Sequence, residues 1–176
     1  MKTLLTLFVL FFSSSVVAEW KENTWVAEYS EGLGSTVSVN GLITHGDRFY
    51  IRIVKSETDA CELGELFFSF YTTMNNSNIL NLNNQILSVK FNDENLYAKI
   101  LHPRKFLLGH RVFIWFAYTP LDDVIELYKD IEIFKLELLD SSEFQSSVYF
   151  DILNNEWSTN NFKNSIHDAK KLCKSN

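Results

Sequence analysis

The chain has 176 residues, a formal net charge of −6 and only two prolines and two cysteines. Binding to nucleic acid or to an anionic membrane surface needs clustered Lys and Arg, so a mildly acidic chain is a poor candidate for either. Aromatic residues make up 15% of the sequence, which favours a sheet-rich domain over a disordered chain.

The first eighteen residues have the parts of a secretory signal peptide. Lys2 supplies a positive charge, residues 4–12 form an apolar run, and the segment ends in small residues at Val16 and Ala18. A membrane anchor is the alternative, but this run is shorter than the roughly twenty apolar residues that span a bilayer. Cleavage before Glu19 is expected to leave 176 − 18 = 158 residues with a net charge of −7, because Lys2 is lost.

The mature segment, residues 19–176, is expected to form a single β-rich domain with no further membrane span. Export to the periplasm, or secretion from a non-bacterial source, would place it in an oxidising compartment. Such a compartment favours a structural disulfide between Cys61 and Cys173, the two cysteines of the chain. The bond would close a loop of 173 − 61 = 112 positions, which the chain-entropy model values at ~4–5 kcal/mol. A reactive or metal-binding pair is the alternative, but the CxxC spacing is absent.

Alternating apolar residues predict strands through the first half of the chain. The first is expected around Trp25, the second over 35–41 and the clearest over 47–56, and the THGD turn is predicted to make the first and third hairpin neighbours. In the clearest strand, one face carries Phe49, Ile51 and Ile53, and the other carries Arg48, Tyr50 and Arg52. A further strand is predicted over 65–73, where Leu66, Phe68 and Phe70 alternate.

The middle of the chain is predicted to contain a long loop, a second hairpin and a central strand. Six asparagines between Asn75 and Asn84 favour turns. The hairpin is expected over 85–102 around the NDEN turn, ended by Pro103. Residues 110–119 (HRVFIWFAYT) are apolar on both faces, which is typical of a strand covered on each side.

The last third is predicted to alternate between helix and strand. Residues 119–130 change to a helical period, with Thr119 as N-cap and Pro120 at the first helical position. Strands are expected over 131–140 and 146–153, followed by a final helix after 158–161. One face of that helix carries Phe162, Ile166, Ala169 and Cys173, so it is expected to dock on the sheet with Cys173 inward.

These elements predict a mainly β (α+β) fold. We expect an antiparallel curled sheet of roughly seven to nine strands, sandwich or barrel-like, with one internal helix and a C-terminal helix packed on it. No motif names a family.

No catalytic or metal-binding pattern stands out, so we expect neither an enzyme nor a cofactor. GxSxG, SxxK and GxGxxG motifs are absent. His102 and His110 flank one loop, but zinc sites need three or four ligands, and His45 and His167 fit exposed positions. Two carboxylate pairs have structural explanations. Asp93 and Glu94 fit a hairpin turn, and Asp122 and Asp123 fit the first turn of a helix.

Binding is the function class that remains, and the basic stretch HPRKFLLGHR with its aromatic neighbours is the candidate surface. Its candidate residues are Arg104, Lys105, Phe106, His110 and Trp115. We expect an exported binding protein, for example an inhibitor or immunity-type partner of another exported or envelope protein. The alternative is a carrier or sensor of a small apolar or amphipathic ligand, held in a β-barrel-like cavity.

Overall fold

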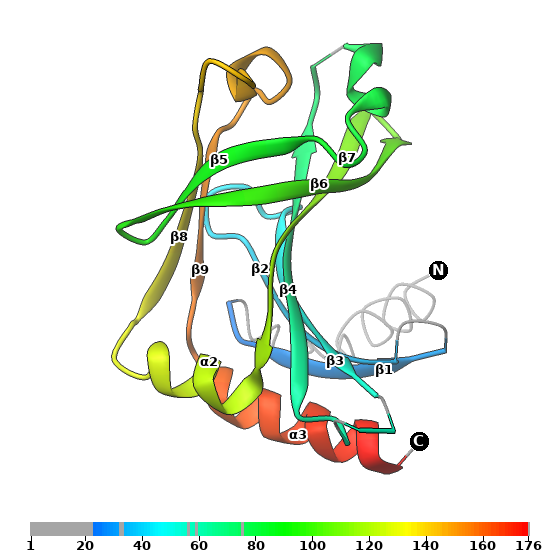
Figure 1. Ribbon diagram of the computed structural model, residues 1–176, viewed down its shortest axis with the longest axis vertical. Coiled ribbons are helices and arrows are strands. Elements are labelled where there is room, and N and C mark those ends of the chain that lie inside the picture. Colours follow the sequence, from blue (N-terminus) through cyan, green and yellow to red (C-terminus); the bar gives the residue numbers. More distant parts are fainter. Residues whose placement is uncertain (1–22, 32–33, 56, 59, 75, 176) are drawn as a thin grey trace, which may run out of the picture.

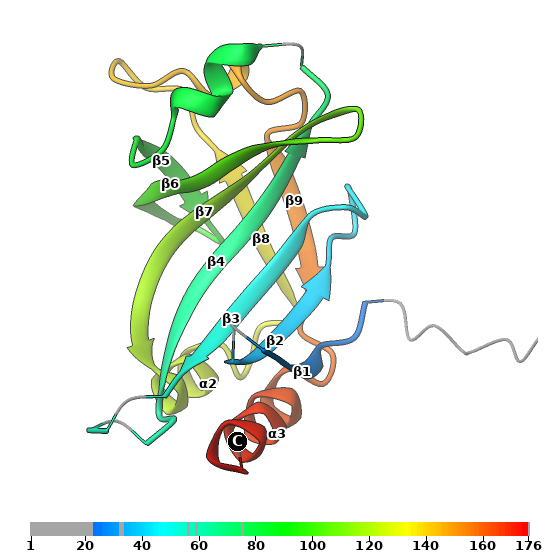
Figure 2. The ribbon, with the colours of Figure 1, turned by 90° about the vertical axis from the view of Figure 1, so that its right-hand side faces the viewer.

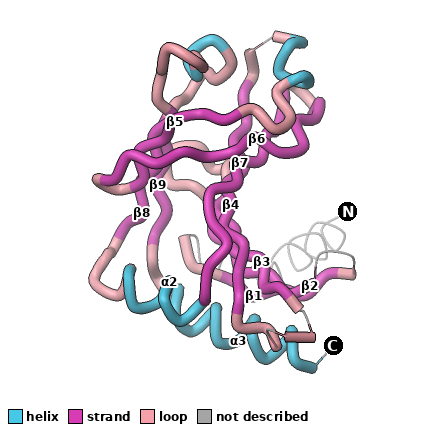
Figure 3. Tube along the Cα trace, viewed as in Figure 1, coloured by secondary structure: helices cyan, strands magenta, loops and turns pink. Residues whose placement is uncertain are grey.

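The computed structural model describes residues 23–31, 34–55, 57–58, 60–74 and 76–175. The predicted signal peptide and its cleavage before Glu19 lie outside these residues. Within them the chain forms one antiparallel sheet of nine strands with two α-helices (Figures 1 and 3). The strands are β1 (Val26–Ser30), β2 (Gly34–Asn40), β3 (Arg48–Val54), β4 (Leu63–Thr72), β5 (Ile86–Phe91), β6 (Glu94–Phe106), β7 (Gly109–Pro120), β8 (Ile133–Leu138) and β9 (Asn154–Ser158). The helices are α2 (Leu121–Leu127) and α3 (Phe162–Ser175), and two 3₁₀ turns are η1 (Ser77–Asn81) and η2 (Ser146–Val148).

The sheet has the order β1-β2-β3-β4-β7-β6-β5-β8-β9 and curls over itself without closing into a barrel. Figure 1 shows β8 and β9 facing the β2–β4 side, with β5 and β6 crossing between the two halves. The halves meet through aromatic rings. The ring centroids of Trp157 in β9 and Phe68 in β4 lie 4.8 Å apart, and those of Phe134 in β8 and Phe49 in β3 lie 5.2 Å apart. The predicted mainly β fold, a curled antiparallel sheet with two helices, is therefore confirmed. The sheet is not closed into a barrel.

The two ends of the sheet approach each other at the β2–β3 turn. The Leu42 amide donates to the Glu156 carbonyl at 2.8 Å, and the buried Asn155 side chain accepts from the Ile43 amide and donates to the Thr44 carbonyl. Gly41 is required at this point, because a Cβ there would lie 2.3 Å from the Asn155 side chain. These bonds hold β9 beside the turn without making it a strand partner of β2.

Helix α3 lies across one end of the sheet, at the bottom of Figure 1, and packs on β1, β2 and β3. Its buried face carries Ser165 and the four predicted residues, which are Phe162, Ile166, Ala169 and Cys173. Cys173 forms the predicted disulfide with Cys61, with their Cα atoms 6.1 Å apart. The docking of the final helix and the cysteine pairing are both confirmed.

Several predicted boundaries are wrong for local physical reasons. Strand β2 lies between β1 and β3, so the strand beside Trp25 and β3 are not neighbours. Pro103 does not end β6, because it lies in a β-bulge between Leu101 and Arg104, where no ladder N–H is needed. The α2 N-cap is Pro120 rather than Thr119, and it makes no side-chain cap bond.

The strand predicted over 146–153 is also wrong. Ser146 Oγ donates to the Leu139 carbonyl, and Ser147 donates through both its amide and its hydroxyl to Asp140. Such local side-chain bonds compete with strand pairing and favour turns, and η2 forms here instead. Strand β9 begins only at Asn154.

Candidate functional site

A groove of about 650 Å³ lies on the outer face of the sheet. Its lining comes from six adjacent strands in the order β1-β2-β3-β4-β7-β6. Five strand spacings of about 4.8 Å give it an extent of roughly 24 Å, measured along the curled sheet. These strands are seen side by side in Figure 2. The groove is therefore a long, shallow surface and not a compact cavity, and it is open to solvent.

The floor of the groove is aromatic. Tyr50 of β3 stacks on Phe67 of β4 with ring centroids 5.1 Å apart, and Phe67 meets Phe113 of β7 edge-on at 5.9 Å. Trp115 lines the groove two residues further along β7. Because strand side chains alternate, these rings face outward while the residues beside them fill the core. Strand β7 is central, as predicted, but its outer face is only half-buried, and none of the described elements forms a layer over it.

Four cationic side chains line the groove against two carboxylates, Glu28 and Glu65. Arg52 forms an ion pair with Glu65. Within the described part of the chain, Arg48, Lys99 and Arg104 form no ion pair; the pairs that do form are those of Arg52, Lys129, Lys135, Lys170, Lys171 and Lys174. The guanidinium of Arg104 lies over the Phe113 ring, 5.5 Å from its centroid. On a chain with a net charge of −6, the groove is therefore locally positive.

A second arginine continues this surface onto the β6–β7 hairpin. Arg104 and Arg111 are direct cross-strand partners, an arrangement of like charges that weakens strand pairing. Arg111 instead stacks on Phe106, 4.5 Å from the ring centroid, and its buried Nε has no hydrogen-bond acceptor among the described residues. Stacking on rings lets the two cations coexist without neutralising either of them.

The structure brings together two of the five candidate residues of the sequence. Arg104 and Trp115 both line the groove. Phe106 lies outside it on the hairpin, half-exposed. Lys105 and His110 are cross-strand partners, and His110 is buried; within the part of the chain that the structure describes, its Nδ1 has no hydrogen-bond partner. The residues that sequence reasoning missed are Tyr50, Phe67, Phe113, Arg48 and Lys99. The signals for them were the outward alternation of Arg48 and Tyr50 and the apolar character of both faces of residues 110–119, which include Phe113.

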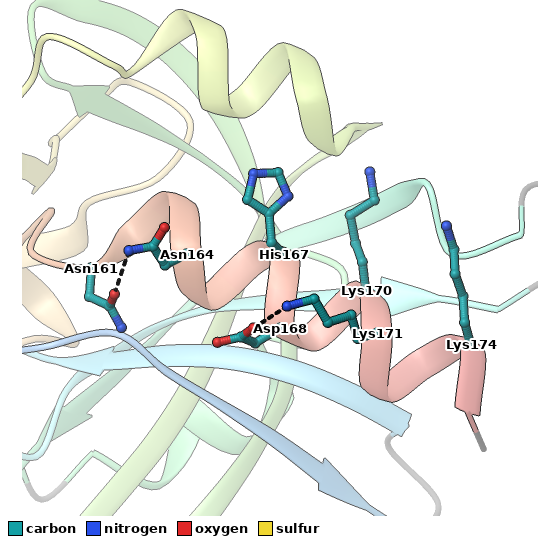
Figure 4. Close-up of a pocket in the computed structure, with 7 residues that line it drawn as sticks. All are labelled: Asn161, Asn164, His167, Asp168, Lys170, Lys171 and Lys174. Atoms are coloured by element: carbon teal, nitrogen blue, oxygen red, sulfur yellow. Dashed lines mark hydrogen bonds and ion pairs between the residues drawn. The ribbon is translucent and has the colours of Figure 1, made fainter.

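A shallower depression runs along the exposed face of α3 (Figure 4). Its lysines are already paired: Lys171 lies 2.9 Å from Asp168, and Lys174 lies 2.8 Å from Glu62. Lys170 contacts Glu62 and Asp122. Hydrogen bonds from Lys170 and Lys174 lower the pKa of Glu62 below its ordinary value. A face whose cations are neutralised in this way is a weaker candidate than the outer groove.

The predicted carboxylate pairs lie at the secondary-structure positions expected of them. Asp122 and Asp123 lie in the first turn of α2, and Asp93 lies in the turn before Glu94 opens β6. Among the residues with a described position, no group of three or more His, Cys, Asp or Glu side chains is arranged to hold a metal ion. None of the helices in the described ranges is long and apolar enough to cross a membrane.

One buried carboxylate, Asp47, has a shifted pKa. Its Oδ1 accepts from the Tyr71 amide at 2.6 Å and its Oδ2 accepts from Asn155 at 3.1 Å, while only 1% of the residue is exposed. Burial raises the pKa of Asp47 from 3.8 to about 6, although both hydrogen bonds and the nearby Arg111 act in the opposite direction. Asp47 joins the β2–β3 turn to β4 and β9, so its ionisation acts on the closure of the sheet.

The stability of the protein should depend on pH through Asp47. Because its pKa is higher in the folded chain, the folded state binds the proton more tightly; the stabilisation is complete below pH about 4 and lost as pH rises through about 6. We expect the free energy of unfolding of the parent, relative to an Asp47→Asn variant, to fall by about 2–3 kcal/mol from pH 4 to pH 7. Urea unfolding at successive pH values measures this.

Only the change with pH in the stability difference between parent and variant tests the assignment to Asp47. In the Asp47→Asn variant, the new side-chain amide would face the Asn155 amide donor, and this penalty does not change with pH. A difference between parent and variant that stays constant from pH 4 to pH 7 would contradict the assignment.

No family model, curated protein or solved structure matches this chain. We therefore infer function from the chemistry of the groove.

Proposed function

We propose that this chain is an exported, non-enzymatic binding protein that recognises an extended acidic segment of a partner protein in the outer groove. The observation that carries the proposal is the set of groove cations without described carboxylate partners, Arg48, Lys99 and Arg104, above an aromatic floor. Carboxylates of a partner would supply the missing ion pairs, and its apolar side chains would cover the rings. The disulfide supports export, because such bonds persist in oxidising compartments.

A polypeptide segment suits the shape of the groove. Its lining spans six strands, roughly 24 Å, which an extended segment of about seven residues would cross. Edge strand β1 borders the groove through Glu28 and Ser30, and β2 is its one partner among the described strands. An inhibitor or immunity-type partner of another exported or envelope protein would use such a surface to hold a segment of its target.

The second candidate is a carrier of a small amphipathic anion. The volume of about 650 Å³ lies in the range of small-molecule sites, and arginine beside aromatic rings suits a carboxylate with an apolar body. The inner face of the sheet offers less support for a carrier, because contacting rings such as Phe49, Phe68 and Trp157 occupy it. This candidate therefore also uses the outer groove.

Selection of a random-sequence peptide library on the exported chain tests the proposal. We expect enrichment of Asp and Glu with interspersed aromatic residues. Binding should weaken with salt, and Arg104→Glu should reduce it by about ten-fold or more, because the reversal places like charges together. The intact mass of the same preparation shows whether residues 1–18 have been removed.

Lys171→Glu is the matched control, since it makes the same change in net charge on α3, outside the groove. It should bind the selected peptides like the parent. Peptides without acidic enrichment, or equal binding by the two variants, would refute the proposal. Displacement of the peptides by dodecanoate at lower concentrations than by free glutamate would favour the carrier instead.

A further inference from the structure

The hairpin that joins β6 to β7 ends in an exposed apolar turn. Leu107 and Leu108 are 87% and 83% exposed, and the adjoining Phe106 is 39% exposed. Phe106 pairs with Gly109 across the turn, so the leucines occupy both central positions of a two-residue connection. Gly, Asn and Asp are the usual residues there, because they suit the backbone of a tight turn. The formation of the turn therefore does not account for the two leucines.

The base of this hairpin is firmly packed. A Cβ at Gly109 would lie 2.1 Å from the Thr72 carbonyl oxygen, so β4 approaches the hairpin too closely for any side chain there. The Phe106 ring meets Tyr71 edge-on at 5.9 Å, and Arg111 covers the same ring. Figures 1 and 2 show the tip in the half of the molecule that lies away from α2 and α3. The leucines thus lie at the tip of a hairpin whose base is well packed.

Basic residues flank the tip on both strands. Arg104 and Lys105 precede it and Arg111 follows it, and none of the three forms an ion pair within the described ranges. Two apolar side chains ahead of unpaired cations match the layering of a bilayer interface, where acyl chains lie beneath charged headgroups.

We infer that the β6–β7 tip inserts Leu107 and Leu108 into the interface of a lipid bilayer that carries anionic headgroups. A protein partner would normally bury about 800 Å² on each side, which a convex two-residue tip does not supply. Shallow insertion at a bilayer interface instead draws on the buried apolar area together with the attraction of cations to anionic headgroups, and the tip offers both. The chain as a whole is acidic, so the leucines provide the attraction, and the flanking cations set the orientation and the headgroup preference. This inference does not rest on the proposed function.

Vesicle flotation of the chain recovered from the exported fraction tests it. The parent is expected to float with vesicles of phosphatidylcholine and phosphatidylglycerol in equal parts, and less with phosphatidylcholine alone. The double variant Leu107→Ser/Leu108→Ser should partition about ten-fold less or lower, because each buried leucine carries its own favourable transfer free energy. Both side chains are exposed, so the variant should keep the parent's unfolding curve.

Leu127→Ser is the matched control. Leu127 is 68% exposed and lies on α2, in the other half of the molecule, so this variant should float like the parent. A parent that does not float, or a tip variant that floats as well as the control, would overturn the inference. Equal flotation with both lipid compositions would overturn the preference for anionic headgroups. Loss of peptide binding by the tip variant, with no flotation of the parent, would assign the tip to a protein contact.

Discussion

Replacing Ile166 with aspartate should remove a large part of the protein's stability. Ile166 is fully buried at the centre of the α3 face that packs on β1, β2 and β3. The substitution loses about 1.5–3 kcal/mol of apolar burial and adds an unpartnered charge beside the sheet. The combined loss, about 4 kcal/mol or more, is a large fraction of the roughly 5–15 kcal/mol by which native proteins are stable.

The neighbours of Ile166 show why the helix cannot easily move aside. The ring centroid of Phe162, one turn earlier, lies 4.8 Å from that of Trp25 and 5.2 Å from that of Phe134, so α3 completes the aromatic core. Ser165 Oγ donates to the Trp25 carbonyl at 2.7 Å, which ties the helix to the start of β1. A displaced helix would expose all of these groups.

Urea unfolding followed by tryptophan fluorescence measures the effect. His167→Asp is the control, because it places the same side chain on the next, exposed position of α3 and should change stability by no more than about 0.5 kcal/mol. An Ile166→Asp protein as stable as this control would contradict the view that docking of α3 holds the domain together.

Removal of the disulfide should lower stability while leaving the fold in place. The chain-entropy model gives ~4–5 kcal/mol for a loop of 112 positions. Cys61 and the preceding Ala60 have φ angles of +69° and +43°, a left-handed region that is costly for residues other than glycine. Relaxation of this backbone after the bond is removed should offset part of the loss, so we expect Cys173→Ser to cost about 2–4 kcal/mol.

The double variant Cys61→Ser/Cys173→Ser avoids a free thiol and should give the same value. Its far-ultraviolet circular dichroism should match the parent, because the buried α3 face and the contacts of Glu62 with Lys170 and Lys174 remain. Unfolding in urea, without reductant, gives the free energies. If both variants were as stable as the parent, the bond would be present without contributing to stability.

Local patterns in the sequence were sufficient for the parts of the fold that depend on one face of one element. Alternation in β3 placed Phe49, Ile51 and Ile53 in the core, because a strand on a one-sided core must bury every second residue. The spacing of the α3 stripe likewise predicted its buried face. With only two cysteines the pairing had a single solution, which the structure confirms.

Other features depended on groups that sequence spacing does not bring together. Residues 146–153 alternate like a strand, but hydrogen bonds from Ser146 and Ser147 to the Leu139–Asp140 segment fold them as a turn. Pro103 stays within β6 because the bulge removes the need for its amide, and the position of that bulge depends on how β6 pairs with β7.

The groove was decided by tertiary structure. The stretch HPRKFLLGHR with its aromatic neighbours identified Arg104 and Trp115, but the floor also needs Tyr50 and Phe67, from strands more than thirty positions earlier in the chain. These residues meet because β4 pairs with β7 rather than with its sequence neighbour β5. Strand order in an antiparallel sheet depends on long-range packing of the core, so outward-facing residues become neighbours as a consequence of contacts made on the opposite face.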